Sequence, residues 1–146
     1  MVLSGRWSNT TTKQWLNRAK RLDDEINTLL NVRRSLSDQL TSITQNYNSD
    51  GSQSTKDPHK FDRLAEIDDD IDQRIANLAE IRMEIIRCIN QVEDCRYRQI
   101  LMGRYIAGWT WEQIAVSIHY SYKQTIRLHG YALMSIEPVI MSLNVL

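Results

Sequence analysis

Apolar residues recur at alternating spacings of four and three through the first third of the chain: Trp15, Ala19, Leu22, Ile26, Leu29, Leu36, Leu40, Ile43 and Tyr47. This spacing predicts a long helix with a narrow apolar seam, which is the pattern of a coiled coil. Arg33 interrupts the seam, and the threonines at positions 10–12 are candidate N-terminal caps. We therefore expect a helix that begins near these threonines and ends by Tyr47.

A polar segment without periodicity, residues 48–57, follows and predicts a loop. Asp57 and Pro58 then provide an N-cap and a first-turn proline, which mark the start of a second long helix. Its apolar stripe is broader than the first seam and comprises Phe61, Leu64, Ile67, Ile71, Ile75, Leu78, Ile81, Ile85, Ile86, Ile89 and Val92. Because the two helices are of similar length, we expect an antiparallel hairpin, in which Arg33 falls beside Asp72.

The broad stripe of the second helix is wider than one neighbouring helix can cover, so the hairpin predicts a partner. A second copy of the chain is favoured, because closed twofold dimers are the commonest oligomers. The alternative is that the C-terminal part of the chain folds over this stripe. The pattern leaves both arrangements open.

Two capping boxes organise the last third of the chain. Thr110 and Gln113 form the first box and start a short helix. His119 occupies the turn that follows, where a left-handed conformation is usual and histidine is tolerated. Ser121 and Gln124 form the second box and start another helix. Two capped helices joined by a tight turn are typical of a helix-turn-helix.

A helix over residues 93–106 precedes this motif, and Pro138 predicts that the last helix ends near Ile136. The chain then divides into an N-terminal helical hairpin, residues 1–92, and a C-terminal helix-turn-helix module, residues 93–146. With five glycines and two prolines among 146 residues, composition also favours an all-α fold.

Net charge is zero overall, which argues against binding polyanions by bulk electrostatics alone. The last third is nevertheless basic, since residues 96–146 contain five Lys or Arg against two Asp or Glu, a net charge of +3.

Cys88 and Cys95 have no second pair or histidine at ligand spacing, so we interpret them as reduced helix residues. The carboxylates at 68–70 point in different directions on a helix, and we interpret them as a solvated face. No apolar run reaches the length of a membrane span, and we expect a cytoplasmic protein.

The helix after the second capping box has an inward face drawn through Thr125, Leu128 and Ala132, flanked by Ile126 and Leu133. The outward residues suit base edges in the major groove, and they are Lys123, Gln124, Arg127 and Tyr131. Ser121 and Tyr122 are placed for phosphate contacts. The arginines of the preceding helix, Arg96, Arg98 and Arg104, are expected to hold the DNA backbone.

The segments Tyr105–Ala115, Tyr120–Gln124 and His129–Leu133 together resemble region 4 of bacterial sigma factors. They are more similar still to phage regulators of late transcription of the RinA and ArpU type, in which this module follows a helical N-terminal part. The resemblance covers about forty residues and implies a phage or prophage origin, with sequence-specific binding at a promoter. It places the recognition helix over Ser121–Arg127. Two positions depart from the family pattern: His119 replaces a turn glycine, and Thr125 replaces an apolar residue.

These patterns predict a DNA-binding transcriptional regulator that is a homodimer through its hairpin. Two alternatives remain: a small terminase-like DNA-packaging protein that assembles as a ring, and an adaptor that binds RNA polymerase without DNA. The sequence contains no nucleophile and base pair, no phosphate-binding loop and no metal-ligand spacing. We therefore expect no enzyme activity, no cofactor or metal, and no small-molecule substrate.

Overall fold

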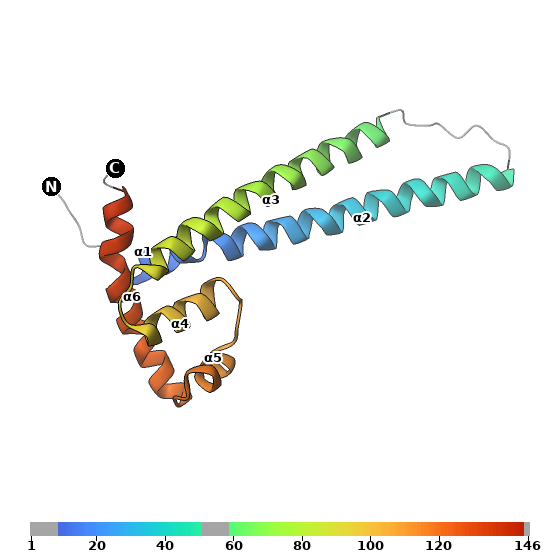
Figure 1. The fold of residues 1–146 in the computed structure, drawn as a ribbon. Helices are drawn as coiled ribbons and strands as arrows, with labels where there is room; N and C mark the ends of the chain where they lie inside the picture. Colours follow the sequence, from blue (N-terminus) through green and yellow to red (C-terminus); the bar gives the residue numbers. More distant parts are fainter. Residues whose placement is uncertain (1–8, 51–58, 145–146) are drawn as a thin grey trace. The chain divides into compact units, whose positions relative to one another are not determined.

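The computed structural model of the chain describes residues 9–50 and 59–144 (Figure 1). Every regular element in these residues is an α-helix, which confirms the expected all-α class. The helices are α1 (Asn9–Leu16), α2 (Arg18–Asp50), α3 (Lys60–Asn90), α4 (Cys95–Tyr105), α5 (Trp111–Ile118) and α6 (Tyr122–Asn144).

Contacts divide the chain into two compact units. One unit is residues 22–78, and the other combines residues 1–21 with residues 79–146. The boundaries between the units fall within α2 and α3, whereas the sequence suggests a domain boundary at residue 92. The C-terminal helices thus share a packing unit with α1 and with the last turns of α3.

The unit of residues 22–78 contains the two arms of a helical hairpin, and ion pairs between the arms report their register. Arg74 Nη1 lies 2.6 Å from Glu25 Oε2, and Arg33 pairs with Asp68. As the residue number rises along α2, its partner's number falls along α3, so the arms are antiparallel. The expected partner of Arg33, Asp72, was wrong by one helical turn, because the pair is with Asp68, four residues earlier on α3. Helix α2 continues to Asp50, so residues 48–50 of the predicted loop are helical.

The remainder of the predicted loop, with the cap at Asp57 and Pro58, lies outside the described residues. The carboxylates at 68–70 lie on a solvated face, as expected, since the side chains of Asp68 and Asp70 are 43% and 46% exposed. Two of them also form ion pairs. Asp68 pairs with Arg33, and Asp70 Oδ1 accepts a hydrogen bond from Arg74 Nε at 3.0 Å. These ion pairs raise the pKa of both arginines. Asp69 is exposed.

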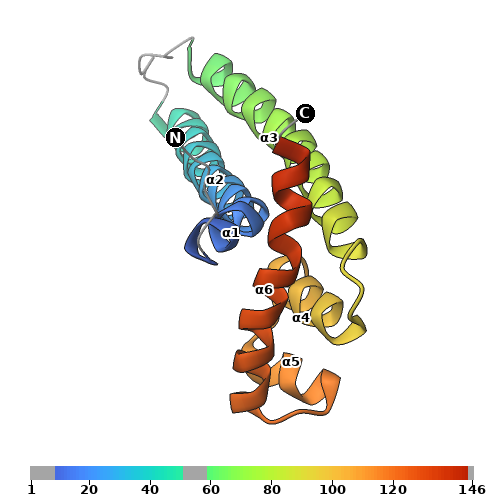
Figure 2. The ribbon, with the colours of Figure 1, turned by 90° about the vertical axis from the view of Figure 1, so that its left-hand side faces the viewer.

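Helix α6 organises the other unit, because α1, α4 and α5 all pack against it (Figure 2). Its core is apolar with three exceptions, and the fully buried side chains include Leu16, Ile85, Ile89, Ile100, Leu101, Ile114, Leu133, Ile136 and Ile140. The threonines at 10–12 lie inside α1 and are not its N-cap, since the helix begins at Asn9. Thr12 is instead fully buried. The N-terminal segment therefore contributes to the core.

The predicted end of the last helix near Ile136 was also wrong, because α6 continues through Pro138 to Asn144. Proline removes the hydrogen bond to the carbonyl of residue 134 and normally breaks a helix. Pro138 and Met134 are both exposed, so the proline lies on the open side of the helix. Ile136 and Ile140 on the opposite side are fully buried. Their packing outweighs the cost of the proline.

Candidate nucleic-acid interface

Both predicted capping boxes are confirmed by their hydrogen bonds. Thr110 N–H donates to Gln113 Oε1 at 2.8 Å, and Gln113 N–H donates to Thr110 Oγ1 at 3.2 Å. In the second box, Ser121 N–H donates to Gln124 Oε1 at 3.2 Å, and Gln124 N–H donates to Ser121 Oγ at 3.1 Å. Each box satisfies amide groups that have no partner within their own helix. The caps thus determine where α5 and α6 begin.

His119 forms the turn between α5 and α6 in the predicted left-handed conformation, with φ 63° and ψ 40°. Its backbone N–H donates to Val116 O at 3.3 Å, and Tyr120 N–H donates to Ala115 O at 3.1 Å. These bonds close the C-terminal end of α5. His119 therefore adopts the left-handed backbone that glycine adopts most readily.

A small core lies beneath the turn, where Ile100, Ile114 and Ile118 contact Trp111, Tyr120 and Leu128. Thr125 is fully buried although an apolar residue is common at its position in the resembled family. Its Oγ1 donates to Ser121 O at 2.8 Å, so the hydroxyl is satisfied inside α6. This bond explains how the core accepts a threonine.

Gly103 marks the close approach of α4 to the residues that precede and form α5. A Cβ atom at Gly103 would lie 2.9 Å from Trp109 Cε3 and 3.3 Å from Ile114 Cγ1. In the sequence, the signal for this close contact is a glycine in the interior of a predicted helix. Trp109 N–H also donates to Gly103 O at 2.8 Å and holds the loop against α4.

The first turns of α6 present an exposed surface, which we call the reader face. The four side chains predicted to point outward are exposed, and so are the two predicted to contact phosphate; the reader face thus includes Ser121, Tyr122, Lys123, Gln124, Arg127 and Tyr131. The Oε1 atom of Gln124 also accepts a hydrogen bond from the Ser121 hydroxyl, at 3.2 Å. The oxygen of Gln124 is therefore committed to the cap.

Ile126 was expected to flank the inward face, and it lies at the edge of that face, with 38% of its surface exposed. Leu133 lies seven residues later on the same side of α6 and is only 1% exposed. The side of the helix that is covered at Leu133 is thus open at Ile126. Ile126 belongs to the reader face, next to Lys123 and Arg127.

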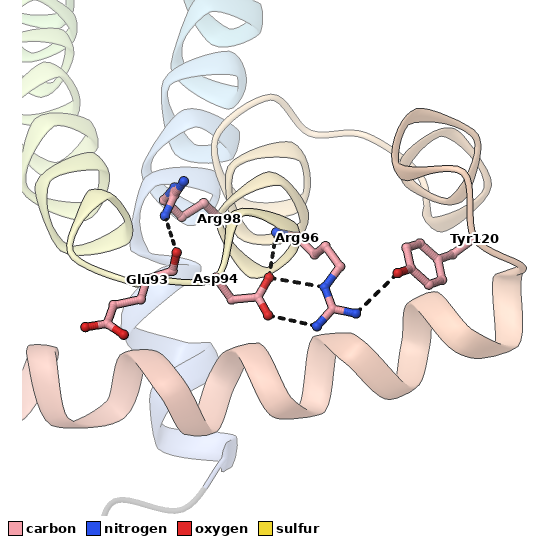
Figure 3. Close-up of polar contacts among 5 residues, drawn as sticks. All are labelled: Glu93, Asp94, Arg96, Arg98 and Tyr120. Atoms are coloured by element: carbon pink, nitrogen blue, oxygen red, sulfur yellow. Dashed lines mark hydrogen bonds and ion pairs between the residues drawn. The ribbon is translucent and has the colours of Figure 1, made fainter.

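Arg96 is held in a network with Asp94 and Tyr120, which Figure 3 draws. Its Nη2 lies 2.8 Å from Asp94 Oδ2, and its Nη1 donates to Tyr120 Oη at 3.2 Å. Asp94 is also the N-cap of α4, since its Oδ1 accepts from Arg96 N–H at 2.8 Å. Hydrogen bonding to Asp94 raises the pKa of Arg96 and lowers the pKa of the carboxyl. Arg96 thus ties the start of α4 to the turn before α6.

Arg98 and Arg104 are likewise engaged within the protein. Arg98 Nη1 donates to Val92 O and to Glu93 O, both at 2.7 Å (Figure 3 shows the second bond). Arg104 Nη1 donates to Trp109 O at 3.2 Å, and its guanidinium lies 4.5 Å from the centre of the Trp111 ring. The three arginines predicted to hold a DNA backbone all make contacts within the module. Arg98 and Arg104 keep their charge and further N–H donors, because their hydrogen-bond partners are neutral carbonyl oxygens. On the reader face itself, the exposed cations are Lys123 and Arg127.

His129 is buried on the other side of α6, where its Nε2 shares a 2.7 Å hydrogen bond with Tyr105 Oη. Its ring meets Trp111 edge to face, with centres 4.6 Å apart. Burial, followed by the charges of Lys13 and Arg104, lowers the pKa of His129 to about 4. Burial also raises the pKa of Tyr105 to about 12. Both side chains are neutral at physiological pH and serve the core.

The cysteines and the acidic side chains offer no further site in the part of the chain that the structure describes. Cys88 is buried, which raises its pKa, and Cys95 is exposed at the start of α4, and both thiols are free. Among residues 9–50 and 59–144, His, Cys, Asp and Glu side chains form no group of three suited to a metal ion. None of the helices described has the length and apolar character needed to cross a membrane. Comparisons with protein-family models, curated proteins and solved structures found no match.

Proposed function

We propose that this chain is a sequence-specific DNA-binding transcriptional regulator that inserts the start of α6 into the major groove. The observation that carries the proposal is the reader face. Two capped helices and a closed left-handed turn hold α6 with its first turns exposed. The N-terminal residues of the second helix are the ones that contact bases in helix-turn-helix proteins.

The charges of the reader face support the same function. Lys123 and Arg127 are exposed and lie four residues apart, on one side of α6. Both residue types donate hydrogen bonds to guanine, and Ser121 and Tyr122 bring hydroxyl groups to the adjoining edge. The positive end of the α6 dipole adds attraction for phosphate at this edge.

Only two cations serve this surface directly, so tight binding requires more than one copy. We propose that the protein is a homodimer through its hairpin and that it recognises a repeated or palindromic site. The resemblance to RinA- and ArpU-type regulators supports a role at phage or prophage promoters in the cytoplasm, without enzymatic activity. RNA polymerase is a further partner that this family implies.

The experiment combines selection with a mass measurement on the purified full-length chain. Duplexes that bind are selected from a random DNA pool at fixed salt concentration and sequenced, and sedimentation equilibrium gives the mass. We expect an enriched palindrome or repeat, and twice the chain mass of 17.1 kDa. Fixed salt matters because phosphate contacts make affinity depend steeply on ionic strength.

Each alternative gives a different outcome. Enrichment together with a ring-sized mass would support a small terminase-like packaging protein. Absence of any enriched sequence would contradict the proposal and support an adaptor that binds RNA polymerase without DNA. Enrichment by a monomer would contradict the dimer alone.

A further inference from the structure

The reader face contains an apolar component that the proposed function leaves unused. Ile126 keeps 38% of its surface exposed, and Tyr122, one helical turn earlier, keeps 51%. Two apolar side chains exposed together on a proposed binding face gain free energy if a partner covers them. The pair lies within the first five residues of α6, where a helix-turn-helix reads bases.

The polar neighbours of Ile126 restrict the partner. Lys123 precedes Ile126 by three residues and Arg127 follows it directly, so exposed cations border the isoleucine. A protein core or a lipid chain would have to bury those charges at a high cost. The major groove instead combines phosphates on its edges with one apolar group on its floor, the thymine C5-methyl.

Hydrogen bonding of adenine by a glutamine, the common polar way to recognise an A·T pair, is restricted in this protein. A glutamine reads adenine with two bonds, one of which needs the side-chain oxygen as acceptor. Gln124 Oε1 already accepts from Ser121 N–H and from the Ser121 hydroxyl, each at 3.2 Å. Reading adenine would therefore break the cap of α6. A contact with the thymine methyl group would recognise the same A·T pair and leave the cap of α6 intact.

We propose that Ile126 is a specificity-determining residue that contacts a thymine methyl group in the major groove, with Tyr122 beside it. The proposal rests on the proposed function and deepens it. The recognised DNA contains an A·T pair next to the guanines contacted by Lys123 and Arg127. Ile126 contributes discrimination, while the cations contribute most of the attraction.

Replacing thymine by uracil tests this contact, because uracil lacks only the methyl and keeps base pairing. The enriched duplex is synthesised with thymine and with uracil at each position in turn, and affinity for the full-length protein is measured. We expect uracil at one position in each half-site to weaken binding about fourfold, the value of one buried methyl group. In the variant Ile126→Ala, the two duplexes should bind alike.

Met134→Ala is the matched control, since Met134 is 59% exposed on the same helix. It lies eight residues beyond Ile126, about 12 Å along the axis, and should retain the fourfold methyl effect. Circular dichroism checks that both variants keep their helix content.

Three other results would contradict the thymine contact of Ile126. Equal affinity of the wild type for all thymine and uracil duplexes would overturn the role of Ile126 while the proposed function stands. A methyl effect that persists in Ile126→Ala, or an enriched motif made only of G·C pairs, would overturn it in the same way. If no duplex is enriched, the result contradicts the proposed DNA-binding function, and the contact of Ile126 that rests on it.

Discussion

At the scale of single residues, the core of the module depends on a histidine that stays neutral. The pKa of His129 is about 4 in the folded chain, against about 6.5 in an unfolded chain. Between these values the unfolded state binds a proton that the folded state does not. Folding stability from this group is thus complete above pH 6.5 and decreases as the pH falls towards 4.

We therefore expect the contribution of His129 to lower the free energy of unfolding by about 2 kcal/mol when the pH falls from 7.5 to 5. Urea denaturation at the two pH values measures the change, and His129→Gln should lack this component. Gln99→Ala, at an exposed position of α4 that carries no titratable group, is the control and should keep the pH dependence of the wild type. Identical pH dependence of wild type and His129→Gln would contradict the burial of a neutral imidazole.

The caps are a second feature at the residue scale. Thr110 accepts from the N3 amide of α5 and receives the reciprocal bond from Gln113. We expect Thr110→Ala to lower the free energy of unfolding by about 1 kcal/mol, the usual value of an N-cap. Exposed Ser117→Ala on the same helix should change it by less than about 0.5 kcal/mol. A Thr110 effect no larger than that of the control would contradict the capping role.

At the scale of elements, α6 contains a proline that its packing tolerates. The proline removes one hydrogen bond from the helix interior, at a cost of up to about 3 kcal/mol relative to alanine. We expect Pro138→Ala to stabilise the protein by about 1 to 3 kcal/mol in denaturant unfolding. Destabilisation by Pro138→Ala would show that the helix does not continue through this residue.

Local signals predicted the elements, and longer-range packing decided where several of them end. The capping boxes at Thr110 and Ser121 and the turn at His119 are local patterns, and all three were predictable. The continuation of α6 beyond Pro138 depends on the burial of Ile140 in the core, which a proline rule does not include. The partner of Arg33 depends on the register between the two arms of the hairpin, and the apolar periodicity does not determine that register.

The candidate site shows the same division. Exposure of Lys123 and Arg127 follows from helical periodicity, so the sequence predicted it. The engagement of Arg96 with Asp94 and Tyr120 requires residues from two other segments, and a list of basic residues does not contain that information. The exposure of Ile126 was not predicted, because periodicity assigns a side to a residue without showing how much of that side another element covers.

At the scale of the whole molecule, the account requires a second copy. Exposed apolar residues on the hairpin arms include Leu30 at 41% and Ile75 at 48%. We expect the double variant Leu30→Glu/Ile75→Glu to weaken dimerisation at least tenfold, because a dimer would bury these charges. Sedimentation equilibrium measures the change against the control Gln73→Glu, an exposed position on α3. An unchanged dimer would exclude these residues from the interface.

The central claim is that the start of α6 reads DNA, and its most direct test is the affinity of Lys123→Ala/Arg127→Ala for the selected duplex. The account predicts a loss of about a hundredfold, from contacts worth roughly 1 to 3 kcal/mol each, with unchanged thermal unfolding. Arg34→Ala/Arg87→Ala removes two exposed positive charges elsewhere and should lose less than threefold. Equal affinity of the wild type and the Lys123/Arg127 variant would contradict the claim.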